Sequence, residues 1–237
     1  MNVLIWNEFT GNAKGEGVLA VYPKGIHNAL KDSLGKNDPS LKITTAVLEQ
    51  PEHGLTQEVL DKTDVLVWWG HCAHDLVGDG AADRVADFVL RGGGIIFLHS
   101  SHLAKPFKRL MGTSCTLKWR EAGEKEVLWA VNPSHPIAQG VPEHIILPHE
   151  EMYGEPFDIP EPDETVFIGW FAGGEVFRSG AAYRRGLGKV FYFQPGHETH
   201  PIYHDPDIIK IIGNAIKWAA PVKKSAPLFC PNPRPVV

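Results

Sequence analysis

Short runs of apolar residues alternate with helix-like segments through the first part of the chain. The predicted strands are Asn2–Trp6, Lys42–Leu48, Val65–Trp69 and Ile95–Leu98. The predicted helices between them are Pro23–Leu34, Thr56–Lys62 and Ala81–Leu90. Strands that are apolar along most of their length are buried on both faces, which requires helices packed on either side. The pattern therefore predicts an α/β fold with a mostly parallel, doubly wound sheet.

The second part of the chain, from Thr116 to Phe193, has strand-like runs with little helix between them. These runs are Leu128–Val131, Ile145–Leu147, Val166–Trp170, Ala181–Arg184 and Val190–Phe193. We interpret them as an antiparallel or mixed extension that shares the same core. The residues after Pro206 form an amphipathic helix, Asp207–Ala219.

We expect one domain over residues 1–220, followed by a proline-rich tail over residues 221–237. The tail is expected to run extended over the surface or over a neighbouring protomer of a homo-oligomer.

Composition excludes several classes of partner. The 237 residues carry a formal net charge of −5 without any basic run, so no nucleic-acid partner is expected. No apolar run approaches the roughly 20 residues that span a bilayer, and the N-terminus does not resemble a secretory leader. We therefore expect a cytoplasmic protein with no membrane partner. The odd number of cysteines, Cys72, Cys115 and Cys230, favours reduced thiols over a disulfide framework.

Histidines gather where the predicted strands end. Eight of the twelve lie there: His71, His74, His99, His102, His149, His197, His200 and His204. The carboxyl ends of strands in an open α/β sheet form the rim of the ligand crevice, so these imidazoles can converge on one pocket. Imidazole and carboxylate ligands from different strand ends suit a divalent metal, most of all Zn²⁺. We expect His71, His99 and His197 to be the metal ligands, with Glu151 as a carboxylate ligand or a base.

The run from Glu150 to Phe157 mixes acidic and apolar residues. The apolar Met152 and Tyr153 would anchor Glu151 inward, where its pKa would suit acid or base chemistry near neutral pH. We therefore assign catalysis to Glu151, His197 and His99. The alternative is a solvated acidic stretch beside ordinary hydrogen-bonded histidines.

The sequence Gly92-Gly93-Gly94 followed by a strand and then His99-Ser100-Ser101 predicts a sharp strand-to-helix turn. Either His99 or Ser100 is expected to have an unusual backbone conformation. A serine nucleophile at Ser100, activated by His197, is an alternative and would make the protein a hydrolase or amidase.

Four further residues are candidates for contact with substrate. Trp69 offers a flat ring for a sugar, Tyr153 adjoins Glu151, Arg178 could bind a substrate oxygen, and His27 lies in a helix that opens onto the crevice. For each, the alternative is a structural role in the core or in an ion pair. His27 could also be a fourth metal ligand.

Several separated motifs together resemble the trehalose-utilisation (ThuA-like) family. They are the Gly92–Ser100 strand and turn, Glu150–Phe157, Gly174–Gly180 and Phe193–Glu198. The resemblance implies the class I glutamine-amidotransferase-like fold, which has a flavodoxin-like sheet, and a link to sugar metabolism. In glutamine amidotransferases a nucleophilic cysteine lies at the strand-to-helix turn. This chain has His99-Ser100-Ser101 at that turn and therefore lacks the cysteine. Glutaminase activity through a thiolate is therefore not expected.

These observations favour an enzyme that acts on a small carbohydrate or a sugar-derived metabolite. A non-catalytic sugar-binding or regulatory protein is the main alternative, since a fold can lose its catalytic residues and keep its shape.

Overall fold

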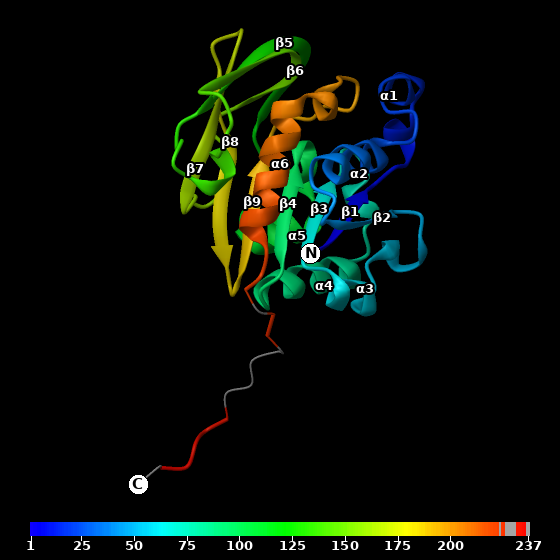
Figure 1. Ribbon diagram of the computed structural model, residues 1–237, viewed down its shortest axis with the longest axis vertical. Coiled ribbons are helices and arrows are strands. Elements are labelled where there is room, and N and C mark those ends of the chain that lie inside the picture. Colours follow the sequence, from blue (N-terminus) through cyan, green and yellow to red (C-terminus); the bar gives the residue numbers. More distant parts are fainter. Residues whose placement is uncertain (223, 226–230, 236–237) are drawn as a thin grey trace.

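One mixed sheet organises the molecule. The computed structural model describes residues 1–222, 224–225 and 231–235, and the counts below refer to those residues. They contain a nine-stranded sheet in the order β2-β1-β3-β4-β9-β8-β7-β5-β6 (Figure 1). The strands are β1 (Asn2–Asn7), β2 (Lys42–Val47), β3 (Val65–Trp69), β4 (Gly94–Leu98), β5 (Lys118–Ala130), β6 (His144–Gly154), β7 (Glu164–Phe171), β8 (Val176–Arg185) and β9 (Gly188–Phe193).

The first four strands and β9 form the parallel half of the sheet. Every residue of β3 and β4 is buried. The predicted parallel, doubly wound arrangement is therefore confirmed, and its cause is the one inferred from the sequence: strands this apolar are stable only with helices on both faces.

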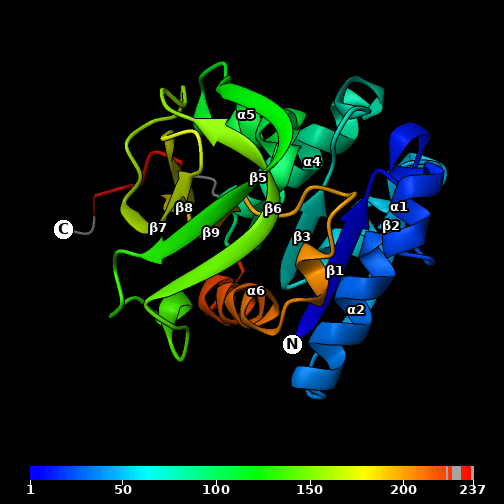
Figure 2. The ribbon, with the colours of Figure 1, turned by 90° about the horizontal axis from the view of Figure 1, so that it is seen from above.

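Helices cover both faces of the parallel half. They are α1 (Glu16–Val21), α2 (Ile26–Asn37), α3 (Gln57–Lys62), α4 (Asp79–Leu90), α5 (Lys105–Met111) and α6 (Pro206–Ala219). Figure 2 shows α2 and α6 on one face and α4 and α5 on the other. Each face has its own apolar core, one containing α2 and α6 and the other α3, α4 and α5.

Side-chain caps fix two helix ends. The Thr56 hydroxyl accepts the backbone N–H of Val59 at the start of α3. At the start of α6 the Asp205 carboxylate accepts the N–H groups of Asp207 and Ile208.

The second half of the sheet is antiparallel, which confirms the predicted extension. The prediction of short strands at Leu128–Val131 and Ile145–Leu147 was wrong in length, since β5 begins at Lys118 and β6 continues to Gly154. The early part of β5 is polar and largely exposed, so it shows no alternation of apolar and polar residues, and register shifts interrupt its pairing with β6.

The turn after β4 is strained, as predicted. His99 has a φ of 53°, in the left-handed region that residues with a Cβ rarely occupy. It opens a short 3₁₀ helix, His99–Leu103, in which His99, Ser100 and Ser101 are buried. The strand thus passes directly into a helical turn and presents His99 at its end.

The chain beyond α6 is anchored near α3. The Lys224 ammonium donates to the carbonyl oxygens of Asp61 and Thr63. The predicted proline-rich tail, residues 221–237, includes residues 223, 226–230 and 236–237, which lie outside the described residues. Cys230 is one of these. Cys72 and Cys115 are free thiols. No helix among the described residues is long and apolar enough to cross a membrane.

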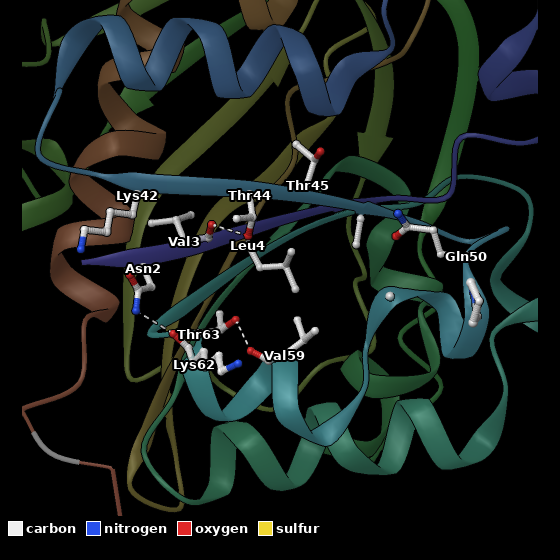
Figure 3. Close-up of a pocket in the computed structure, with 13 residues that line it drawn as sticks. Asn2, Val3, Leu4, Lys42, Thr44, Thr45, Gln50, Val59, Lys62 and Thr63 are labelled. Atoms are coloured by element: carbon white, nitrogen blue, oxygen red, sulfur yellow. Dashed lines mark hydrogen bonds between the residues drawn. The ribbon is translucent and has the colours of Figure 1, made fainter.

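A hollow of about 720 Å³ runs along β2, between that edge strand and α3 (Figure 3). Lys42, Thr44 and Lys62 are among its lining residues, and none of the histidines that end the strands borders it. The hollow is therefore separate from the strand ends where the histidines gather.

The contact between β4 and α6 yields a test of the packing. A Cβ added at Gly94 would lie 2.7 Å from the Ala219 Cβ. Because backbone on both sides is fixed by the sheet and the helix, we expect Gly94→Ala to lower the free energy of unfolding by about 1–3 kcal/mol in urea titrations. Gly17→Ala in α1 is the control, because nothing lies within 4 Å of its added Cβ. Equal stability of the two variants would contradict this packing.

Candidate metal centre

The structure brings together the three histidines and the glutamate expected from the sequence. Ligand atoms of His71, His99, Glu151 and His197 all lie within 4.8 Å of one another. His71 follows β3, His99 follows β4, His197 follows β9, and Glu151 lies on β6. The carboxyl ends of the parallel strands therefore meet a strand of the antiparallel extension at one site.

Within this group, His99 and Glu151 lie in direct contact. Nε2 of His99 lies 3.1 Å from Oε2 of Glu151. Nδ1, the opposite nitrogen, lies 3.1 Å from the carbonyl oxygen of Gln194. A carbonyl only accepts, so Nδ1 carries the hydrogen, and a neutral His99 presents the lone pair of Nε2 to the carboxylate. Neither Nε2 nor Oε2 has a hydrogen-bond partner of acceptable geometry among the described residues.

Two buried lone pairs at this distance repel unless a cation lies between them. In the ion-free protein that cation is a proton. Burial opposes charge on His99, but the carboxylates of Glu151, Glu150 and Glu198 outweigh it and raise the pKa of His99 to about 9. Burial would raise the pKa of Glu151, yet His99 lowers it. A metal ion can replace this proton, since two donors on one ion lie roughly 3.0–3.4 Å apart.

The other imidazoles are oriented by partners on their far side. Nδ1 of His71 lies 3.2 Å from Oε1 of Glu198, and Nδ1 of His197 lies 2.8 Å from the hydroxyl of Thr199. Burial and the nearby His99 lower the pKa of His197 to about 3, which keeps its ring neutral. Neutral imidazoles held by a carboxylate, a carbonyl or a hydroxyl are the usual arrangement around a bound metal.

Two buried glutamates, whose roles the sequence did not reveal, hold the loops that carry the ligands. Glu8, directly after β1, accepts the backbone N–H groups of His71, Cys72 and Ala73. Glu150 accepts those of Glu151, Gly196 and His197. Glu150 is fully buried, and these contacts give it a structural role. The position of Glu8 at a strand end was the one signal in the sequence.

Comparisons with known proteins agree with this fold. A family model described as trehalose utilisation (ThuA) matches residues 2–219. The chain belongs to the ThuA family. No curated protein sequence matches it significantly.

Solved structures resemble this ThuA-family chain throughout its length. A putative ThuA-like protein from Bacteroides uniformis superposes with a TM-score of 0.65 at 15% identity, covering 92% of this chain and 91% of that one. A cytoplasmic protein from Salmonella typhimurium has a TM-score of 0.64 at 15% identity, covering 93% and 100%. A protein from Thermoplasma acidophilum described as part of a putative GMP synthase has a TM-score of 0.51 at 14% identity, covering 92% and 93%. These likenesses establish the glutamine-amidotransferase-like fold.

The residues expected to touch substrate lie in different surroundings. Trp69 is fully buried and donates its indole N–H to the Gly196 carbonyl, so neither ring face is open to a sugar. Arg178 forms a bidentate pair with Glu155. His27 is buried and its ring nitrogens meet Asn7 and Asn28. Two of the four adjoin the cluster: Tyr153 is stacked on His99 with ring centroids 5.2 Å apart, and Trp69 is stacked on His71 with centroids 6.1 Å apart.

Most of the remaining strand-end histidines contact backbone carbonyls or other rings. His102 is buried with Nδ1 2.7 Å from the Cys115 carbonyl, and burial lowers its pKa to about 3. Burial likewise lowers the pKa of His74 to about 4. His149 and His204 meet backbone carbonyls, and His200 packs against His149 and His197. The structural alternative therefore describes His102, His149 and His204, whereas Nε2 of His74 is buried and has no hydrogen-bond partner among the described residues.

A buried hydrogen-bond chain supports the loop behind His99. The Ser179 hydroxyl lies 3.2 Å from Oε1 of Glu126 and 3.3 Å from Oε1 of Gln194. One hydroxyl hydrogen cannot serve two acceptors, so the chain is satisfied only if Glu126 is protonated and donates to Ser179. Burial, followed by the charge of Glu150, raises the pKa of Glu126 well above its usual value. Gln194 in turn donates to the Glu151 carbonyl and accepts from His99.

The protonated Glu126 makes stability depend on pH. The unfolded chain releases this proton above about pH 4.5 whereas the folded chain keeps it, so stability attributable to Glu126 falls as pH rises, by at most about 1.4 kcal/mol per pH unit. We expect Glu126→Gln, which resembles the neutral acid, to lose less stability than the wild type between pH 5 and pH 8 in urea titrations. Glu143→Gln at an exposed position should follow the wild type. Parallel curves for wild type and Glu126→Gln would show that Glu126 is ionised.

Proposed function

We propose that this protein is a metal-dependent enzyme that acts on a sugar or a sugar-derived metabolite. The ion would be divalent, with Zn²⁺ the first candidate, held by His71, His99, His197 and Glu151. One observation carries the proposal: the buried Nε2 of His99 and Oε2 of Glu151 lie 3.1 Å apart with no other hydrogen-bond partner among the described residues. This geometry suits two ligands of one ion.

The bound ion would act as a Lewis acid on a substrate oxygen or lower the pKa of a bound water. The chain's own residues supply the rest. Glu198 orients His71 through Oε1, and its Oε2 is buried, lies 3.8 Å from Nε2 of His197 and has no hydrogen-bond partner among the described residues. Glu198 is therefore a second carboxylate able to take or give a proton at the site. If Glu151 serves as the base instead of a ligand, the three histidines hold the ion and leave a coordination position open.

The carbohydrate assignment rests on the family, whose model is described as trehalose utilisation. The related Salmonella typhimurium protein is described as cytoplasmic, which supports the same location for this chain. A small-molecule sugar remains our proposed partner, within a homo-oligomer whose size light scattering would measure.

The serine-hydrolase alternative has little support in the site. The Ser100 hydroxyl is buried and has no hydrogen-bond partner among the described residues, so no imidazole activates it. A non-catalytic sugar-binding protein would share the fold and bind sugar without turnover. Product analysis with the metal-loaded protein separates that alternative from an enzyme.

Metal content is the first test. Protein purified without a polyhistidine tag should contain about one divalent ion per chain by plasma mass spectrometry, because four preorganised ligands converge on one point. Dialysis against a chelator should remove the ion, and added Zn²⁺ should restore it. Substoichiometric metal after growth and reconstitution in Zn²⁺, Mn²⁺ and Fe²⁺ would overturn the proposal. Ser100→Ala should bind the ion as the wild type does.

Substitution by glutamine should lower metal affinity at Glu151 and the free energy of unfolding at its neighbour Glu150. Glu151→Gln removes a ligand charge and should weaken metal binding at least about tenfold with little change in melting temperature. Glu150→Gln places an amide N–H against backbone N–H donors, because both carboxylate oxygens are used. It should cost about 1–3 kcal/mol of stability. Competition titrations with a metal indicator and urea unfolding measure the two effects, and wild-type metal affinity in Glu151→Gln would exclude it as a ligand.

A further inference from the structure

The early part of β5 reaches the rim of the metal centre. Oε1 of Glu121 lies 3.5 Å from Nε2 of His197, although the Glu121 side chain is 60% exposed. This strand segment was not recognised as a strand from the sequence. It therefore adds residues to the site that neither the motifs nor the histidine pattern indicated.

Trp119 lies two residues before Glu121 on the same strand. It pairs directly with Tyr153 of β6. Side chains of directly paired residues project from the same face of a sheet, about 4.5–5.5 Å apart at Cβ. Tyr153 stacks on the metal-cluster residue His99, so the indole of Trp119 lies on the strand face that looks toward the cluster.

The exposure of Trp119 is unusual for its position. It is 65% exposed, whereas Trp68 and Trp69, which also lie at a strand end near the crevice, are buried to within 1%. A large, flat, apolar ring left open near a cluster of polar side chains is typical of a ligand-binding surface. Residues two apart on a strand are separated by about 7 Å, so Trp119 and Glu121 are spaced by roughly the width of one pyranose ring.

We propose that Trp119 is the platform on which a pyranose ring of the substrate stacks, with Glu121 accepting its hydroxyl groups. A pyranose has an apolar C–H face that fits a flat indole and a rim of hydroxyls that needs acceptors. The platform holds the sugar one ring away from the metal ligands. This inference rests on the proposed function for the identity of the ligand class, and it names a residue that determines substrate binding.

The test is isothermal titration of the Zn²⁺-loaded protein with trehalose and with glucose. Trp119→Ala should weaken sugar binding roughly tenfold or more, because an aromatic anchor is lost. Trp119→Phe keeps a flat ring and should stay within about threefold of the wild type. Metal affinity and melting temperature should be unchanged in both variants.

Trp170→Ala is the matched control. Trp170 on β7 is 48% exposed but pairs with Val127, eight residues farther along β5 than Trp119. Equal loss in Trp119→Ala and Trp170→Ala, or no loss in either, would overturn the platform while leaving the metal centre intact. A metal-loaded wild type that binds neither sugar would overturn it too. A wild type that binds sugar but no metal would overturn the proposed function alone, and Trp119→Ala would still decide the platform.

Discussion

The site depends on one buried contact between two groups that would repel each other without a cation. The carbonyl of Gln194 fixes the hydrogen of His99 on Nδ1, so its other nitrogen faces the Glu151 carboxylate as a lone pair. A proton resolves the conflict in the ion-free protein, which is why the pKa of His99 rises to about 9 despite full burial. In the proposed metal-bound protein, the ion would take the place of this proton, with the imidazoles of His71 and His197 close enough to join it. The surrounding strands and loops, held by the buried carboxylates of Glu8 and Glu150, preserve this geometry.

Buried carboxylates around the cluster make that geometry rigid. Removing a carboxylate from water is costly, and Glu8 and Glu150 offset the cost by accepting three backbone N–H groups each. Five of the N–H groups belong to the loops that carry His71 and His197 and the sixth belongs to Glu151 on β6, so satisfying the carboxylates also positions these three residues. Glu126 avoids the cost of a buried charge in a different way, because it remains protonated within a chain of hydrogen bonds. Stability and ligand placement therefore rest on the same contacts.

The strained turn after β4 shows how a fold can keep its geometry while its chemistry changes. The left-handed backbone at His99 has the form of an elbow that exposes a nucleophile, yet an imidazole stands there and the adjacent Ser100 hydroxyl has no partner among the described residues. Strain of this kind persists only where the surroundings over-determine it. The turn after β4 here delivers His99 to the cluster, so the likeness to other structures of this fold extends to the backbone.

The sequence alone determined the parallel half of the sheet, the covering helices and the three strand-end histidines that the structure brings together, because buried strands and their ends leave strong local signals. It also pointed to Glu151 through its apolar neighbours. It could not show that Trp69 is fully buried in the core, or that Glu150 accepts backbone N–H groups of the loop after β9. Nor could it show that β5 begins at Lys118 and places Glu121 beside His197. Those facts depend on which distant backbone groups and side chains a residue meets. Only the tertiary structure decides such contacts, because pairing across a sheet and burial of charge are set by partners far away in the sequence.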